Sequence, residues 1–325
     1  MHNPAGSNAP TEASQSITVA SLAREIDDAL QLLKDYGSVT QSSALPAENA
    51  LPGLIDQCMA MCALPPAISR EPIRTIHHMA CTGGTLISKC LAAMPNAQLL
   101  SEIDPLSEMP IKGERPQFAP TDMVIQARQS TRGVRPEMLV EFFLTNLDVL
   151  YRDAERGGLR LVLRDHAHSQ FCTRQDAAAR PTLREMLRER HEVLSVVTVR
   201  DPLESYIALR GHKWVHFEPA TLEEYCARYL VFLQRHEGIA IFKYEDFVVD
   251  PQRTMRRMCD VLQMPYQDQF ELLFDVFKLT GDSGRKGDQI APRPPRQPDE
   301  LLRKEAGLSE SYRKLEAVLG YDSSR

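Results

Sequence analysis

Short apolar runs alternate with amphipathic segments through most of the chain after residue 70. Runs rich in Ile, Val and Leu, typical of buried strands, recur at 73–79, 98–100, 159–163, 194–199 and 239–244. Apolar residues at helical spacing lie between these runs, at 85–94, 136–155 and 221–236. Strands that alternate with helices form a parallel sheet covered on both faces. The pattern therefore predicts an α/β fold with a central parallel sheet of about five strands flanked by helices.

The pattern before residue 71 is different. The first 16 residues are rich in Ser, Asn, Pro and Ala, a composition typical of disordered segments. Apolar residues between 22 and 33 then recur at helical spacing and predict an amphipathic helix. We expect a helical, partly disordered N-terminal extension at 1–70 and a main domain at 71–325. The extension packs either on the core or on another subunit, and the second arrangement gives a homodimer.

The amino-acid composition argues against a nucleic-acid partner and a transmembrane segment. The chain has 325 residues, a net charge of −6 and 43% apolar residues, so it is globular and has no general affinity for nucleic acid. No apolar run approaches the ~18 residues of a membrane span, and the N-terminus lacks the pattern of a secretory signal. Seven cysteines without framework spacing indicate reduced thiols. We expect a cytoplasmic protein with no transmembrane segment and no nucleic-acid partner.

Polar residues follow four of the predicted strands. They are Cys81, the segment Arg164–Asp165–His166, Arg200 and Tyr244. Because the carboxyl ends of parallel strands meet at one edge of the sheet, we expect these side chains to form a single site. His77 and His78 lie on the strand that enters it, and strand alternation turns one toward the ligand and the other toward the helices.

The segment Cys-Thr-Gly-Gly-Thr-Leu at 81–86 stands between a predicted strand and a predicted helix. The backbone N–H groups of such a turn converge on an anion, and the helix N-terminus adds partial positive charge. It is not a Walker A loop, which needs four residues between its glycines and a lysine after them. Here Gly83 and Gly84 are adjacent and no lysine follows, which disfavours a P-loop kinase. The segment therefore predicts a phosphate cradle.

The cradle is the first of four segments whose order resembles that of the PAPS-dependent sulfotransferases, where PAPS is 3′-phosphoadenosine-5′-phosphosulfate. The others are Val-Arg-Asp-Pro at 199–202, Tyr-Glu-Asp-Phe at 244–247 and Arg-Lys-Gly at 285–287. The resemblance, to bacterial-type members in particular, implies a P-loop-NTPase-like sulfotransferase fold for the main domain. It also implies transfer of a sulfuryl group from PAPS to an acceptor.

The resemblance assigns PAPS binding to two groups of residues. The 5′-phosphosulfate would be held by Cys81, Thr82, Gly83, Gly84, Thr85 and Leu86, and the 3′-phosphate by Arg200, Ser205, Arg285, Lys286 and Gly287. Two positions depart from the family pattern. Cys81 stands where the family has a basic residue, and the family's phosphate-binding serine is replaced by Ala208, with Ser205 one helical turn earlier.

Two residues are candidates for the catalytic base. Glu102 follows the second predicted strand and resembles, in position, the catalytic glutamate of tyrosylprotein and some bacterial carbohydrate sulfotransferases. The segment Arg164–Asp165–His166 resembles the Lys-x-His segment of cytosolic sulfotransferases, where histidine is the base, and Arg164 then replaces the lysine. An imidazole titrates near neutral pH and suits such a role. A capping carboxylate and a structural histidine are the alternatives, and the base stays open between the two residues.

Other functions also remain open. His166 and His168 have His-x-His spacing, but no third ligand is evident, so we expect no metal. The absence of a basic residue at Cys81 leaves open an alternative, a nucleotide-binding relative of the same fold that does not catalyse transfer.

The acceptor is expected to offer a hydroxyl or an amine on a small molecule, a carbohydrate or a lipid. Residues 106–135 form the largest insertion near the site, and we expect them to shape the acceptor pocket. The insertion is basic, with arginines at Arg115, Arg128, Arg132 and Arg135. Their charge favours an anionic acceptor, and a solvated loop explains them equally well.

Overall fold

The computed structural model describes residues 28, 31, 70–109, 119–280 and 289–321. The chain divides into two units, residues 1–69 and 70–325. The predicted N-terminal helix falls almost wholly outside the described residues, as do Arg115 and the predicted 3′-phosphate ligands Arg285, Lys286 and Gly287. Everything below concerns the second unit.

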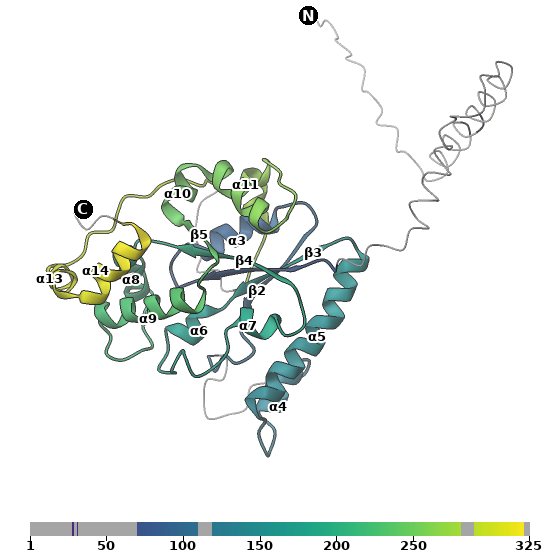
Figure 1. Cartoon of the computed structure of the whole chain (residues 1–325), viewed down its shortest axis with the longest axis horizontal. Coiled ribbons are helices and arrows are strands. Elements are labelled where there is room, and N and C mark those ends of the chain that lie inside the picture. The colour runs from purple at the N-terminus through teal and green to yellow at the C-terminus, as the bar shows by residue number, and fades with distance from the viewer. Residues whose placement is uncertain (1–27, 29–30, 32–69, 110–118, 281–288, 322–325) are drawn as a thin grey trace, which may run out of the picture. The chain divides into compact units, whose positions relative to one another are not determined.

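Five strands form one sheet in the order β2-β3-β1-β4-β5, and all the neighbouring pairs are parallel (Figure 1). The strands are β1 (Ile73–His78), β2 (Ala97–Ile103), β3 (Arg160–Asp165), β4 (Val193–Val199) and β5 (Ala240–Lys243). The predicted α/β class and the five-stranded parallel sheet are therefore confirmed. All six residues of β1 are buried, as expected for the central strand of a sheet covered on both faces.

Helices connect the strands and cover the sheet (Figure 1). In chain order they are α3 (Gly84–Ala92), α4 (Met123–Arg128), α5 (Pro136–Arg156), α6 (Ala167–Phe171), α7 (Leu183–Leu187), α8 (Pro202–Gly211), α9 (Leu222–Arg235), α10 (Tyr244–Val249), α11 (Pro251–Val261), α12 (Phe270–Leu273), the 3-10 turn η2 (Phe274–Val276), α13 (Glu300–Leu308) and α14 (Glu310–Leu319). The three helices predicted from apolar spacing match α3, α5 and α9. Capping residues determine where such helices begin. The Thr221 side chain caps α9 by accepting a hydrogen bond from the backbone N–H of Glu224.

The apolar core lies in layers on the two faces of the sheet. On one face, Ile76 of β1 packs with Leu86 of α3, Phe247 of α10 and Met255 of α11. On the other face, Val197 of β4 belongs to a cluster with residues of α6, α8, α9 and α14, and α5 and α7 pack with β3 in a third cluster. The carboxyl end of the sheet is left between these layers, so the segments after the strands can meet there.

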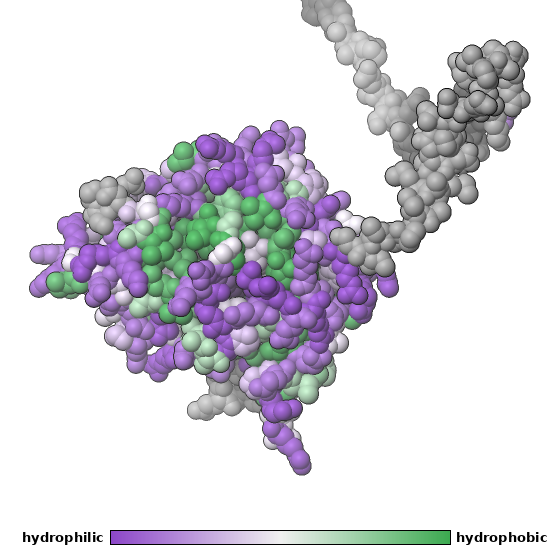
Figure 2. Space-filling model, viewed as in Figure 1, coloured by the Kyte–Doolittle hydropathy of each residue, from purple (hydrophilic) through white to green (hydrophobic). Residues whose placement is uncertain are grey.

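An apolar region lies at the surface on the face shown in Figure 2. Figure 2 shows it over the β4–β5 end of the sheet, between polar helices. Ile241 on the edge strand β5 and Val318 on α14 are exposed to 47% and 59% and line a small second cavity. Among the described residues, no helix combines the length and the apolar character needed to cross a bilayer.

Candidate functional site

A cavity of about 500 Å³ lies at the carboxyl ends of the strands. Residues from every segment predicted to follow a strand line it, namely Cys81, Glu102, Arg164, Asp165, His166, Arg200 and Tyr244. Gly83, Gly84, Thr85 and Leu86 of the predicted cradle line it as well. Since parallel strands point their carboxyl ends the same way, one sheet edge gathers residues that are far apart in the sequence.

The cradle needs both of its glycines. Gly83 is the N-cap of α3 and has a left-handed backbone with φ of 87°. A Cβ atom there would lie 2.2 Å from the Tyr244 ring, and one at Gly84 would lie 2.2 Å from the His78 ring. No described side chain caps the N-terminus of α3, whose first N–H groups therefore remain for an external acceptor. This arrangement favours an anion at the start of the helix.

Gly83→Ala is expected to lower the melting temperature much more than Gly158→Ala. Both glycines have positive φ, so both alanines carry a backbone cost of about 1–2 kcal/mol. A Cβ at Gly158 meets nothing within 4 Å, whereas one at Gly83 must displace the Tyr244 ring. Thermal unfolding of the two variants measures the difference. Equal melting temperatures would show that the Tyr244 contact does not restrict this position.

Arg164 joins the cradle to the candidate bases. Its guanidinium is buried and donates to Thr85 Oγ1 at 2.8 Å and to His78 Nε2 at 2.9 Å. It also forms an ion pair with Glu102 Oε1 at 2.8 Å. The other carboxylate oxygen of Glu102 lies 3.1 Å from His166 Nε2. The structure thus brings the three predicted catalytic residues into direct contact beside the cradle.

Burial sets the protonation states around Arg164. It raises the pKa of Glu102, and the fields of Arg164 and His166 oppose that rise. Burial, reinforced by Arg164, lowers the pKa of His78 to about 3, so this imidazole is neutral. Its Nδ1–H faces the Met79 carbonyl at 3.0 Å, which leaves Nε2 to accept from Arg164. A neutral His78 therefore orients the guanidinium without competing for the carboxylate.

The backbone at Glu102 differs from the sequence prediction. The predicted second strand ended at residue 100, but β2 continues to Ile103 and contains Glu102. The pairing of β2 with β3 shifts register between Leu100 and Ile103, and Glu102 has φ of 60°. Such an irregularity re-aims a side chain, here toward the cavity. A left-handed backbone is costly for a non-glycine residue and is common at functional sites.

Arg200 lies on the other side of the cradle, between β4 and α8. It pairs with Glu204 at 3.1 Å, reaches the Cys81 carbonyl at 3.4 Å, and lies over the Tyr244 ring at 4.9 Å. Its Nε is buried and has no hydrogen-bond partner among the described residues. An unpaired buried donor is costly, so Nε is available for a further acceptor.

Ser205 and Thr82 do not line the cavity. The Ser205 side chain is fully buried, donates to the Asp201 carbonyl at 3.0 Å and accepts from the Tyr225 hydroxyl at 2.9 Å. The Thr82 hydroxyl donates to the Met79 carbonyl at 2.7 Å. Both hydroxyls therefore brace the turns that carry cavity residues, and Ala208 lines the cavity where the family serine is expected.

Two arginines near the C-terminus lie in the Pro-rich stretch after the Arg-Lys-Gly segment, where the sequence gathers basic residues suited to a compact anionic ligand. Arg293 and Arg296 precede α13 and line the cavity. Arg296 donates its backbone N–H to the Glu204 side chain, which fixes this segment on α8. Burial raises the pKa of the Cys81 thiol to about 11 against the opposing fields of Arg296 and Arg200. Cys81 is thus neutral, and Arg296 lies close enough to act on it electrostatically.

The wall of the cavity away from the cradle carries rings. His212 stacks on Trp214 at 4.6 Å between centroids, and His168 meets Trp214 edge-on at 6.0 Å. Burial lowers the pKa of His168 to about 3, so its ring is neutral. Of the described residues in the 106–135 insertion, Met109 lines the cavity. Arg128 of the same insertion instead donates a hydrogen bond to the Pro105 carbonyl. This wall offers the flat faces of rings.

The match to a known family covers more than half of the chain. Residues 76–268 match the family described as "Sulfotransferase family". The chain belongs to the sulfotransferase family. The predicted family is thereby confirmed, and sulfuryl transfer is the general activity of this sulfotransferase.

Several solved structures are similar at low identity. The sulfotransferase domain of the Synechococcus PCC 7002 olefin synthase is 18% identical, with a TM-score of 0.45 over 79% of this chain and 98% of that one. A sulfotransferase from Alicyclobacillus acidocaldarius is 17% identical, with a TM-score of 0.42 over 78% and 97%. Mouse sulfotransferase SULT7A1 complexed with PAP is 11% identical, with a TM-score of 0.35 over 75% and 88%. No curated protein matches this chain, so its family assignment rests on the family match over residues 76–268.

Proposed function

We propose that this sulfotransferase transfers the sulfuryl group of PAPS to a hydroxyl or amine of a small-molecule, carbohydrate or lipid acceptor. One observation carries the proposal. Gly83 and Gly84 at the start of α3 line the same cavity as Arg200, and among the described residues neither the N-terminus of α3 has a side-chain cap nor the buried Nε of Arg200 a hydrogen-bond partner. Both are donors that an anionic ligand would satisfy. A nucleotide with phosphate on both sides of its ribose can reach the two together.

The proposed nucleotide lies with its 5′-phosphosulfate at Gly83, Gly84 and Thr85. Its 3′-phosphate contacts Arg200, together with Arg285, Lys286 and Gly287 as the family resemblance implies. Ser205 enters as a support rather than a ligand, because its buried hydroxyl braces the first turn of α8 beside Arg200. No metal takes part in this binding.

In this proposal, two arginines supply the positive charge that the family's basic residue would provide at the position of Cys81. Arg164 contacts Thr85 from β3, and Arg296, in the segment before α13, lines the same cavity as Cys81. Guanidinium groups make strong, charge-assisted hydrogen bonds to phosphate and sulfate oxygens. The two arginines would flank the phosphosulfate and replace the single basic residue of the family loop.

The catalytic roles follow from the contacts of Glu102. PAPS supplies an activated sulfuryl group. The acceptor oxygen or nitrogen bonds to sulfur as the bond from sulfur to the phosphate oxygen breaks, and the acceptor proton passes to Glu102 or His166. The nearest atoms of these two side chains lie 3.1 Å apart, so whichever is the base is positioned by the other. Arg164 stabilises the charge that develops on the leaving phosphate.

A nucleotide-binding relative without catalysis is the second candidate, and the neutral Cys81 thiol favours it. Labelled PAPS incubated with panels of alcohols, phenols, amines and sugars separates the two proposals. Transfer of label to an acceptor, absent in Glu102→Gln, supports the enzyme. Stabilisation by PAP without any transfer supports the binding module, and stabilisation by ATP instead of PAP contradicts both. The cytoplasmic location and the homodimer stay predictions, to be tested by cell fractionation and size-exclusion chromatography.

Arg200→Ala is expected to weaken PAP binding by about tenfold or more, since each charge-assisted bond contributes roughly 1.5–3 kcal/mol. Arg296→Ala should weaken PAPS binding more than PAP binding if Arg296 contacts the sulfuryl end. Arg228→Ala is the matched control. Arg228 forms the same kind of ion pair one helical turn apart and is equally exposed, at 17%, but it does not line the cavity. Calorimetry that finds Arg200→Ala and Arg228→Ala equal in affinity would remove Arg200 from the binding site.

A further inference from the structure

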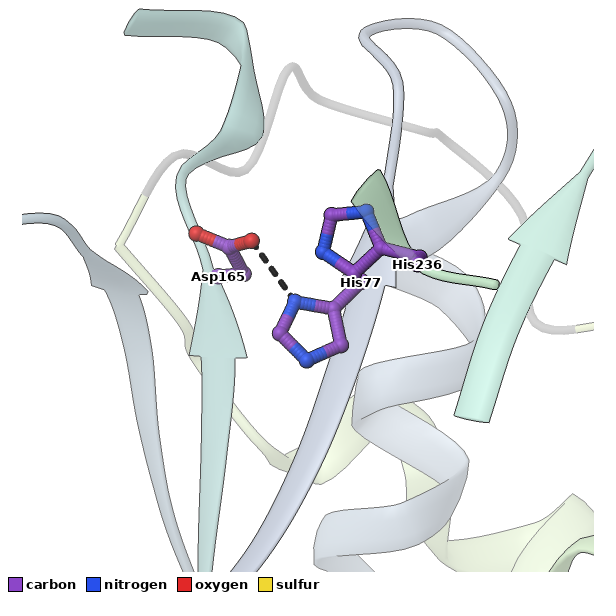
Figure 3. A group of neighbouring side chains, drawn as sticks. All are labelled: His77, Asp165 and His236. Carbon is purple, nitrogen blue, oxygen red and sulfur yellow. Dashed lines mark hydrogen bonds and ion pairs between the residues drawn. The ribbon is translucent and has the colours of Figure 1, made fainter. Parts of the chain in front are cut away.

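Three buried side chains from separate elements meet beside Asp165, which is one of them and also lines the cavity (Figure 3). His77 comes from β1, Asp165 ends β3, and His236 follows α9. Their exposed fractions are 0%, 4% and 3%. One ring nitrogen from each histidine and one carboxylate oxygen lie within 4.8 Å of one another. His77 thus faces the helices while His78 faces the cavity, which confirms the predicted division between the two histidines.

His236 presents a buried nitrogen to this cluster. Its Nδ1 lies 2.8 Å from the Phe232 carbonyl and can only donate there, so Nε2 carries the lone pair. That Nε2 is buried and has no hydrogen-bond partner in the part of the chain that the structure describes. Figure 3 shows a nitrogen on the side of the ring that faces Asp165 and His77. The described residues around His236 therefore direct the Nε2 lone pair at the cluster and supply no hydrogen-bond donor to it.

His77 is held in a matching way. Its Nε2 lies 2.8 Å from Thr75 Oγ1, and its Nδ1 lies 2.7 Å from Asp165 Oδ2. When Nε2–H donates to the threonine hydroxyl, Nδ1 offers its lone pair on the side of Asp165. Each histidine then has one nitrogen fixed by a neighbouring oxygen and the other directed inward. Metal-binding histidines are oriented by this kind of second hydrogen bond.

We propose that His77 Nδ1, the Asp165 carboxylate and His236 Nε2 bind a divalent metal ion, for which zinc is the best match. Two imidazoles and one carboxylate are a common zinc donor set. Bonds of about 2.0–2.1 Å in tetrahedral geometry place ligand atoms about 3.3 Å apart. The separations in the cluster run from 2.7 Å up to at most 4.8 Å and so bracket that value. Water completes the coordination on the cavity side, where Asp165 reaches the wall.

The electrostatics of the cluster suit an ion. Burial raises the pKa of Asp165 to about 7 and lowers the pKa values of His77 and His236 to about 3. Neutral imidazoles are the form that ligates a metal. Any proton on the Asp165 carboxyl group is released when a cation binds there. Arg180, Arg184 and His166 also act on these groups, and none of the three supplies a cation bonded to Asp165.

The ion has a structural role. It ties β1, β3 and the end of α9 together, and it fixes Asp165 between Arg164 and His166, which both line the active cavity. Zinc therefore positions two residues of the sulfotransferase site without contacting the sulfuryl group. The proposal is independent of the choice of PAPS as donor.

Metal content of the full chain tests the proposal directly. The protein is prepared without a polyhistidine tag, in zinc-supplemented medium, and analysed for all first-row metals. About one tightly bound ion per chain is expected, with zinc predominant. After removal of metal with a chelator, titration with Co²⁺ should produce the visible absorption of a tetrahedral site. A metal content well below stoichiometric, with no Co²⁺ spectrum, overturns the proposal even if PAPS transfer is observed.

A pair of variants locates the site. His236→Gln should lower zinc affinity by more than about 100-fold. Mutation of a residue that only hydrogen-bonds to a metal ligand already lowers metal affinity by about 10–100-fold. His191→Gln is the matched control: the His191 side chain is 6% exposed and pairs with Asp148 at 2.9 Å, outside the cluster. Competition with a chromophoric chelator should give wild-type affinity for His191→Gln. Equal affinity in the two variants places the metal elsewhere and contradicts the assignment. If His236→Gln does not fold, the Co²⁺ spectrum of the wild type still decides.

Discussion

Glu102→Gln is expected to lower turnover at saturating PAPS by about 10²–10⁴-fold, the usual effect of losing a general base. The amide keeps the size of the side chain but cannot take a proton. PAP affinity should not change, because Glu102 contacts Arg164 and His166 rather than the cradle. Single-turnover measurements with labelled PAPS give the rate, and calorimetry gives the affinity. Glu224→Gln, which alters a comparable Glu–Arg pair on α9, should leave both unchanged.

His166→Ala distinguishes the two candidate bases. If Glu102 takes the proton, the alanine variant loses less activity than Glu102→Gln, because His166 then only orients the carboxylate. If His166 takes it, the ranking reverses, and a near-normal rate in Glu102→Gln would falsify the Glu102 assignment.

The pH profile gives a separate test of Glu102. A base must be deprotonated, so activity is retained above its pKa and lost as the pH falls through it. Burial raises the pKa of Glu102 from its usual value near 4.5, so the acid limb of the wild-type profile should lie above that pH. The limb should disappear in Glu102→Gln, whose residual rate no longer depends on this group. A limb of unchanged position in the variant assigns the titration to another residue.

Arg164→Met should lower turnover by about 10²–10³-fold, comparable to the loss of one preorganised donor at a developing negative charge. The change also removes the ion pair that opposes the rise in the Glu102 pKa. That pKa therefore rises further, and the acid limb moves to higher pH. Arg164→Lys, which places at this position the residue that the family resemblance suggests, should recover part of the rate. Initial rates across pH for both variants measure these effects.

Arg180→Met is the control for lost stability. Arg180 forms a buried ion pair with Asp104 at 2.7 Å and does not line the cavity. Breaking a buried pair destabilises a protein wherever it lies. A folded Arg180→Met with near-normal turnover, beside an impaired Arg164→Met, shows that the guanidinium acts on the reaction. If both lose activity and melting temperature in parallel, Arg164 serves only to hold the fold together.

Most of the fold was predictable because its signals are local. Apolar runs and helical spacing depend on neighbouring residues, and they located all five strands and the helices α3, α5 and α9. The end of β2 was misplaced. The register shift that extends β2 through Glu102 depends on pairing with β3, which lies more than fifty residues later in the chain. The order of the strands in the sheet likewise depends on tertiary packing.

The turn at Gly83 and Gly84 was predictable for a similar reason. Adjacent glycines at a strand–helix junction have a backbone requirement that is visible in one segment, and the structure shows the close approach of Tyr244 and His78 that enforces it. Ser205 shows the limit of this reasoning. Helical spacing placed it on a plausible face, but burial against Tyr225 directs its hydroxyl away from the cavity. Whether a side chain reaches a ligand depends on what packs around it.

The sequence by itself determined the α/β class, the family and the set of strand ends where chemistry is possible. Only the tertiary structure decided that Glu102, Arg164 and His166 touch, that Arg296 and Cys81 line one cavity, and that His77, Asp165 and His236 converge. The physical reason is that local patterns record backbone preferences, which act over a few residues. Contacts between side chains from different strands depend on sheet order, register and burial, and these are set by the packing of the whole chain.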